Sequence, residues 1–206
     1  MSSRRTILVG LAASAFTAQP AAAPAFARRS LAWDIRLVDA ARSQIGVTVG
    51  YDPAYRALDY PGGDVAPTTG VCTDVIIRAY RSALGFDLQV AINEDMVSDF
   101  SAYPDRWGLS RTDRNIDHRR VPNLETYFKR EGAERAADGW TAGDLFTGRL
   151  GRAKLPHIAI VSDRRTHGES RPLLIHNIGR GTEESDAWSL FSDWRRFRFN
   201  PGLDAG

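Results

Sequence analysis

The one cysteine of the chain, Cys72, is the residue with the clearest capacity for chemistry. Cys72, Ile76 and Tyr80 recur at helical spacing, which predicts a helix over 72–84 with the thiol at its N-terminal end. Unpaired N–H groups and the positive end of the helix dipole at that position favour thiolate over thiol. A lone cysteine is more often a small buried apolar residue than a nucleophile, so a reactive thiol requires partners elsewhere.

Two histidines, His157 and His176, are the candidate partners. They lie in predicted strands, 156–162 and 172–179, and the polar loop between them indicates a hairpin. A symmetric loop would place His157 directly opposite His176 on one face of the sheet, with Cβ atoms about 5 Å apart. His157 is then the expected base for Cys72, and His176 the group that orients it.

The residues around the two reactive segments give further expectations. The same symmetric loop pairs Val161 with Pro172. Ala159 and Val161 would leave room on the face of His157 for the cysteine helix. At the start of that helix, Thr68 or Thr69 is the expected cap.

The polar residues near the predicted turns are candidates for substrate contacts or for ion pairs. His118, Arg119 and Arg120 follow one another in a predicted loop, where they could contact an anionic group of a substrate. A solvated or structural role for these residues is an alternative interpretation. Asp74 lies about 200° round the helix from Cys72, so we expect it to pair with Arg78 at i+4 rather than to act as a base.

The remaining elements must position these residues. Helices are predicted over 31–45, beside the cysteine helix, and after Asn123, which is the expected cap of a helix that stops at Gly132. Gly85 is expected to end the cysteine helix. The polar segment 93–108 is predicted to be rich in turns, and short strands begin after Trp140.

Residues 1–27 have the pattern of a secretory signal, with the twin arginine Arg4–Arg5, a mostly apolar run over 7–18 and small residues before position 28. The apolar run is shorter than the about 20 residues of a spanning helix, which makes an uncleaved anchor the weaker alternative. We therefore expect a periplasmic or secreted protein without a stable membrane span, and a single domain over 28–206.

The charge balance argues against nucleic acid as a partner. Loss of residues 1–27 takes Lys+Arg from 27 to 25 while Asp+Glu stays at 25, so the formal net charge falls from +2 to zero. One cysteine allows no internal disulfide, so an exported protein with an unpaired thiol requires an explanation, which a reactive site provides. The sequence indicates no cofactor and no particular oligomeric state.

Six segments resemble an uncharacterised bacterial family of exported proteins that is catalogued as a domain of unknown function. They extend over nearly the whole chain after the signal, at 72–81, 93–96, 115–124, 143–144, 157–163 and 176–179.

More remotely, the helix-borne cysteine and the His-Ile-Ala-Ile-Val and Leu-Ile-His strands are similar to the NlpC-like branch of papain-fold peptidases, many of which cut peptide bonds in bacterial cell walls. The resemblance implies an α+β, papain-like fold with helices packed on a small antiparallel sheet, and a Cys72–His157–His176 triad. A tyrosine followed by glycine often lines that site. Tyr60 before Pro61-Gly62-Gly63 is the nearest match, although the proline departs from the pattern.

An exported cysteine hydrolase that cleaves cell-wall peptide or other amide bonds is therefore the leading hypothesis. One alternative is a non-catalytic binding module of the cell envelope that keeps the fold. A second alternative is a metal site built from His157, His176 and Cys72 or Asp144. It is the weaker of the two, because the sequence has no helical His-x-x-x-His pair and no second cysteine.

Overall fold

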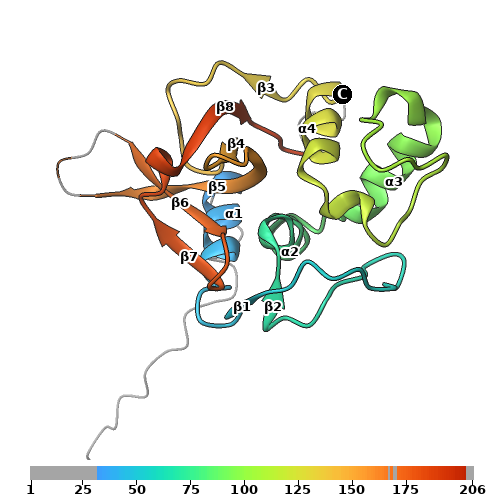
Figure 1. Ribbon diagram of the computed structural model, residues 1–206. Helices are drawn as coiled ribbons and strands as arrows, with labels where there is room; N and C mark the ends of the chain where they lie inside the picture. The colour runs from blue at the N-terminus through green and yellow to red at the C-terminus, as the bar shows by residue number, and fades with distance from the viewer. Residues whose placement is uncertain (1–31, 167, 169–170, 203–206) are drawn as a thin grey trace, which may run out of the picture. The chain divides into compact units, whose positions relative to one another are not determined.

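Four α-helices and a six-stranded antiparallel sheet organise the residues that the computed structural model describes, 32–166, 168 and 171–202. The helices are α1 (Trp33–Arg42), α2 (Cys72–Leu84), α3 (Leu88–Ser98) and α4 (Val121–Arg130). The sheet has the order β3-β8-β4-β5-β6-β7, from β3 (Glu134–Arg135), β4 (Leu145–Leu150), β5 (Leu155–Arg165), β6 (Pro172–Asn177), β7 (Thr182–Ser185) and β8 (Phe191–Phe197). Helices packed on an antiparallel sheet make this an α+β fold, as expected (Figure 1).

Smaller elements complete the chain. A parallel pair, β1 (Gly50–Tyr51) and β2 (Thr69–Gly70), precedes α2, and 3₁₀ turns occur at η2 (Phe100–Ala102), η3 (Asp117–Arg119) and η4 (Trp188–Leu190). The predicted signal, residues 1–27, lies outside the described residues. Within the described part of the chain, none of the helices has the length and apolar character needed to cross a membrane.

The larger core lies between the helices and one face of the sheet. In Figure 1, α1 and α2 lie side by side next to β5 and β6, and both helices contact these strands. Ile76 and Tyr80 of α2 pack in one cluster with Ile158 and Ile160 of β5. Side chains alternate between the two faces of a strand, so residues 157, 159 and 161 face away from α2.

The opposite face of the sheet carries a second, aromatic core. Trp188 packs against Phe146 with ring centroids 5.0 Å apart, and Ala159 and Val161 belong to the same cluster. The expectation that Ala159 and Val161 make room for the cysteine helix is therefore wrong, because they meet aromatic side chains instead.

Strands β5 and β6 form the predicted hairpin with a register shifted by two residues. Val161 pairs with Leu174, not with Pro172, and a bulge before Arg165 takes up the extra residues of β5. A shift of two residues leaves every side chain on its original face. His157 and His176 therefore still share a face, as diagonal rather than directly opposite neighbours.

The two ends of α2 give one correction and one confirmation. No threonine caps the helix. Val71 is the N-cap residue, and its N–H donates to the Asp74 carboxylate over 2.7 Å. Gly85 ends the helix as predicted, with a left-handed φ of 67° that suits a residue without Cβ.

Two other helix boundaries differ from the sequence analysis. Segment 93–108 is not all turns, since α3 extends to Ser98 and is capped by Asp87, whose carboxylate accepts from the Gln89 N–H. Helix α4 begins at Val121, with Pro122 in its first turn, so Asn123 lies inside the helix rather than at its cap.

A buried ion pair joins the start of α2 to η3. Arg119 donates from Nε and Nη2 to the two carboxylate oxygens of Asp74, both over 2.9 Å, and their side chains are 2% and 3% exposed. The expected Asp74–Arg78 pair is absent, because Arg78 binds Asp64 over 2.8 Å. Charge-assisted, bidentate geometry makes the Asp74–Arg119 contact a strong tether.

We expect Arg119→Gln to lower the free energy of unfolding by about 3–5 kcal/mol, because it leaves the Asp74 charge buried without its partner. Arg56→Gln is the matched control. It removes an exposed pair with Asp52, in which the arginine is 58% exposed, and should leave the free energy of unfolding almost unchanged. Urea denaturation of both variants measures the difference, and equal losses would contradict the structural role of Arg119.

Candidate functional site

The predicted contact between the two histidines is present. His157 Nε2 lies 2.9 Å from His176 Nδ1, and the rings meet edge to face at an interplanar angle of 82°. Both side chains are buried, and the His157 ring stacks on Phe191 at 4.9 Å. The packing on Phe191 and the bond to His176 together fix the orientation of His157.

The hydrogen bonds continue from His176 into β7. His176 Nε2 is 3.1 Å from the Ser185 hydroxyl, which donates to the Glu183 carboxylate over 3.0 Å. Strand pairing places Glu183 opposite His176 and Ser185 opposite Leu174. The sequence analysis missed both residues because it assigned no strand after residue 179.

These bonds determine which ring nitrogens carry protons. A carboxylate only accepts, so the Ser185 hydroxyl must donate to Glu183 and accept from His176 Nε2–H. Nδ1 of neutral His176 is then an acceptor, and His157 must donate to it from Nε2. Nδ1 of neutral His157 is therefore the unprotonated nitrogen, which is the state that a general base requires.

Burial keeps both rings neutral at pH 7. It lowers the pKa of His157 to about 3, assisted by the nearby His176, and lowers the pKa of His176 to about 4 against the opposing effect of Glu183. An apolar, water-poor setting disfavours the charged imidazolium.

Cys72 is the first residue of α2 and is 5% exposed. The backbone of Ile158, the residue after His157, lies near the sulfur and acts to lower the pKa of the thiol. Burial nevertheless raises the pKa of the thiol to about 11, with Asp74 adding to the effect. The expectation of a thiolate at the helix start is wrong for the resting protein, because desolvation outweighs the donors around the sulfur.

A pocket of about 340 Å³ opens onto Cys72. Val71, Cys72 and Pro156 line it together, so a ligand would reach the thiol beside the start of β5. His157 does not line the pocket and stacks on Phe191 on the other face of the sheet, so the expected contact between His157 and Cys72 is not present among the described residues. The pocket is lined by Tyr51, Pro53, Val71, Cys72, Arg106, Trp107, Ile116, Arg119, Arg120, Val121, Pro122 and Pro156.

The tyrosine of this pocket is Tyr51, not Tyr60. The Tyr60 ring lies under the Arg114 guanidinium at 5.4 Å, away from the residues that line the pocket. Parallel pairing of β1 with β2 sets Tyr51 opposite Gly70, two residues before Cys72. Burial raises the pKa of Tyr51 to about 12, with Cys72 and Asp74 contributing. The signal in the sequence was the extended segment ending at Tyr51.

The three basic residues at 118–120 lie in different environments. His118 is 2% exposed, does not line the pocket, and has a pKa lowered to about 4 by burial, so it is not placed to meet an anionic substrate. Arg119 lines the pocket but is committed to Asp74. Arg120 also lines it, stacked on Trp107 at 4.0 Å. Arg106, which the sequence analysis missed, is a further cation there.

The metal alternative lacks a ligand set. Among the described residues, no three His, Cys, Asp or Glu side chains come together in a way that could hold a metal ion. Asp144, the fourth residue considered, is bound by Arg198 over 2.9 Å.

Comparison with known proteins places this site in a family. The family model described as "Domain of unknown function (DUF1287)" matches residues 38–199, a range that includes Cys72, His157 and His176. The chain is similar to "Uncharacterized protein YijF" of Escherichia coli (strain K12), with 45% identity over 185 residues that cover 86% of this chain and 89% of that protein. No solved structure matches. The chain is thus a member of the DUF1287 family.

Proposed function

We propose that this protein is an exported cysteine hydrolase that cleaves peptide or amide bonds of cell-wall peptidoglycan on a papain-like, NlpC-like scaffold. The observation that carries the proposal is the hydrogen-bonded series Glu183–Ser185–His176–His157, because it leaves Nδ1 of His157 unprotonated in a strand whose next residue, Ile158, packs in one cluster with Cys72. Export is proposed from the signal-like pattern of residues 1–27.

The chemistry follows from the protonation states. The resting groups are a neutral thiol and a neutral imidazole. Because His157 faces away from α2, substrate binding must first bring its Nδ1 to the sulfur; the Cys72 proton then passes to His157 Nδ1 as the sulfur attacks the substrate carbonyl carbon. When the C–N bond breaks, His157 returns this proton to the leaving amine. Water then hydrolyses the thioester, which releases a carboxylic acid and restores the thiol.

Groups around the pocket fit the remaining tasks. The imidazolium formed at His157 is stabilised by His176, which holds the hydrogen bond to Nε2. The Cys72 N–H and the Tyr51 hydroxyl are donors for the developing oxyanion. A pKa of about 12 keeps Tyr51 protonated, so it can donate over the working pH range.

The rival function is a non-catalytic binding module of the cell envelope. The pKa of about 11 for the buried thiol favours a non-catalytic module, because it means that no thiolate is preformed at Cys72. The neutral pair of the proposed mechanism is compatible with the same observation, so turnover is the property that separates the two functions.

Cys72→Ser should abolish digestion of purified peptidoglycan while leaving the fold nearly intact, because a hydroxyl is close to a thiol in size but far harder to ionise. Mass spectrometry of the released fragments measures turnover, and circular dichroism reports the fold. Cys72→Ala is the control for background activity. Full activity of the serine variant would overturn the nucleophile assignment.

The two histidines should differ in effect. His157→Ala is expected to lower kcat by about 10²-fold or more, because it removes the acid–base group. His176→Asn should retain measurable activity, since an amide oxygen can accept the ring N–H of His157. Steady-state kinetics on the same substrate compares them. An active His157→Ala beside an inactive His176→Asn would reverse the proposed roles.

The pH dependence of thiol labelling tests the resting protonation state. A pKa of about 11 predicts that alkylation of Cys72 by iodoacetamide accelerates steadily from pH 6 to pH 10 without a plateau. The same chain in denaturant is the control, and it should titrate near the ordinary thiol value of about 8.5. A plateau at pH 5–7 in the folded protein would instead indicate a preformed thiolate–imidazolium pair.

A further inference from the structure

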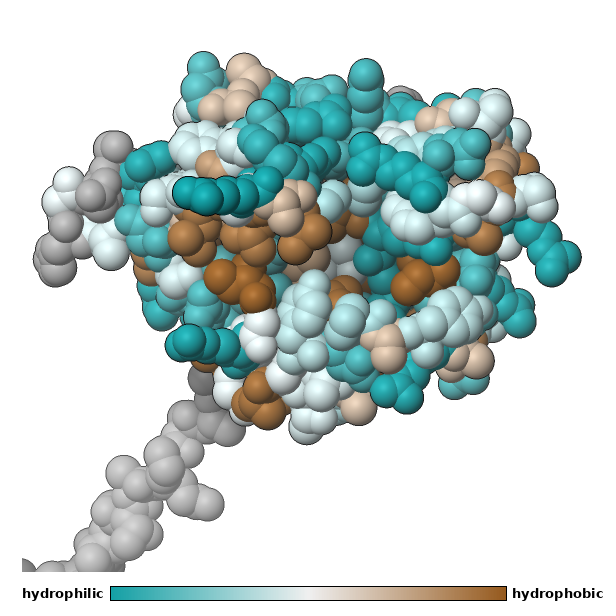
Figure 2. Space-filling model, in the orientation of Figure 1, coloured by the Kyte–Doolittle hydropathy of each residue, from teal (hydrophilic) through white to brown (hydrophobic). Residues whose placement is uncertain are grey.

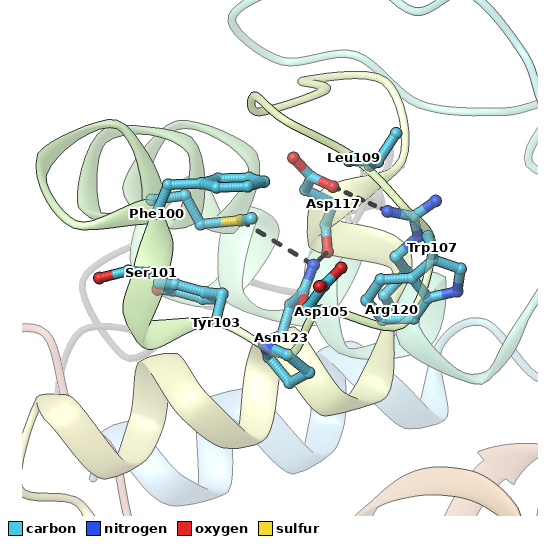
Figure 3. Close-up of a pocket in the computed structure, with 11 residues that line it drawn as sticks. Phe100, Ser101, Tyr103, Asp105, Trp107, Leu109, Asp117, Arg120 and Asn123 are labelled. Carbon is cyan, nitrogen blue, oxygen red and sulfur yellow. Dashed lines mark hydrogen bonds and ion pairs between the residues drawn. The ribbon is translucent and has the colours of Figure 1, made fainter.

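A second pocket adjoins the one that opens onto Cys72. It has a volume of about 320 Å³ and shares Trp107 and Arg120 with the Cys72 pocket. The residues around it come from α3, η2, the loop over 103–109, η3 and the start of α4 (Figure 3). The side chains of Trp107 and Arg120 would therefore separate a group bound in the second pocket from a substrate bound at the thiol.

The walls of this pocket are mostly apolar. Figure 3 shows Phe100 and Tyr103 on one side and Trp107 with Arg120 on the other. Met96 and Leu109 add further apolar surface, and Trp107 is 38% exposed. Apolar patches appear on the surface in Figure 2, which colours residues by hydropathy. The volume is near the lower end of the about 300–1,000 Å³ of small-molecule sites, which suits one bulky side chain better than a large cofactor.

Apart from the exposed Asp105, the charged and polar groups that line the pocket are paired with protein groups. The Asp117 carboxylate accepts from Arg120 Nη1 over 3.1 Å and from the Asp113 N–H over 2.5 Å. Asn123 Nδ2 donates to the Asp117 carbonyl over 3.1 Å, and the Tyr103 hydroxyl donates to Asp95 over 2.5 Å. An anionic ligand group would lose its hydration here without gaining a free cation, because Arg120 is paired with Asp117, and a cationic group would meet only the exposed Asp105 at the rim.

We propose that this second pocket is a specificity subsite that receives a large apolar side chain of the substrate, next to the bond attacked by Cys72. The inference rests on the proposed function for the position of that bond. Its chemistry rests only on the apolar walls and on the internal pairing of Asp117 with Arg120. The Arg120–Trp107 stack is the partition between the two pockets and would contact both parts of the substrate.

Equilibrium binding tests the subsite without requiring turnover. Calorimetry of the full Cys72→Ala chain is performed with the N-acetyl amides of phenylalanine, lysine, glutamate and glycine. Burial of an aromatic side chain predicts binding of the phenylalanine amide about tenfold or more tighter than that of the other three. Equal binding of the lysine or glutamate amide, or no binding of the phenylalanine amide, would overturn the proposal.

Two variants locate the bound group. Leu109→Trp fills the pocket and Trp107→Ala removes part of its wall, so both should weaken binding of the phenylalanine amide by about tenfold. Leu190→Trp is the matched control, because Leu190 is 47% exposed and lies in η4, outside the pocket. Unchanged binding in both pocket variants would contradict the assignment. If Cys72→Ser remains active while the aromatic preference holds, the proposed cysteine mechanism is wrong and the assignment of the second pocket still stands.

Discussion

The Asp74 carboxylate is the group on which the position of the thiol depends. It accepts the N–H of Val71, the residue that caps α2, and it binds the Arg119 guanidinium with both oxygens. Gly70 completes this arrangement, because a Cβ at that position would lie 3.0 Å from Asp74 Oδ2. One buried carboxylate therefore fixes the first turn of α2, and Cys72 with it, against the segment that supplies Arg119 and Arg120.

The sheet also holds the residues that lead into α2. Asn177, the residue after His176, donates from Nδ2 to the carbonyls of Gly50 and Gly70, both over 3.1 Å. The end of β6 is thus tied to the β1–β2 pair, which carries Tyr51 and leads into Cys72. His176 belongs to the histidine series, and its neighbour Asn177 holds the segment that leads into the thiol. A displacement of β6 would therefore move both the histidines and Cys72.

Burial determines the electrostatic character of the site. It raises the pKa of Cys72 and lowers the pKa values of His157 and His176, so each group is pushed toward its neutral form. A neutral thiol reacts slowly with oxidants and electrophiles, because the thiolate is the reactive species. Under the proposed function, substrate contacts in the Cys72 pocket must then supply the stabilisation that makes proton transfer to His157 favourable.

Much of this arrangement was predictable from local patterns, and the failures have physical reasons. The helix at Cys72, its end at Gly85 and the hairpin with two histidines on one face follow from periodicity, and a two-residue register shift does not alter the face. The partner of Asp74 and the packing of Ala159 depend on contacts between distant segments, which spacing along the chain does not encode. Tyr51 was missed because a two-residue parallel pair has no periodic signal of its own, and Ser185 was missed because β7 is short and polar.

The most direct test of the account is to identify the atom that carries the acyl group during turnover. Digestion of peptidoglycan by the wild-type protein is quenched in acid within milliseconds to seconds, and the intact and proteolysed protein is analysed by mass spectrometry. The account predicts a thioester of a wall fragment on the peptide that contains Cys72, removable by hydroxylamine. Release of products without any adduct on Cys72, or with an adduct on another residue, would contradict it.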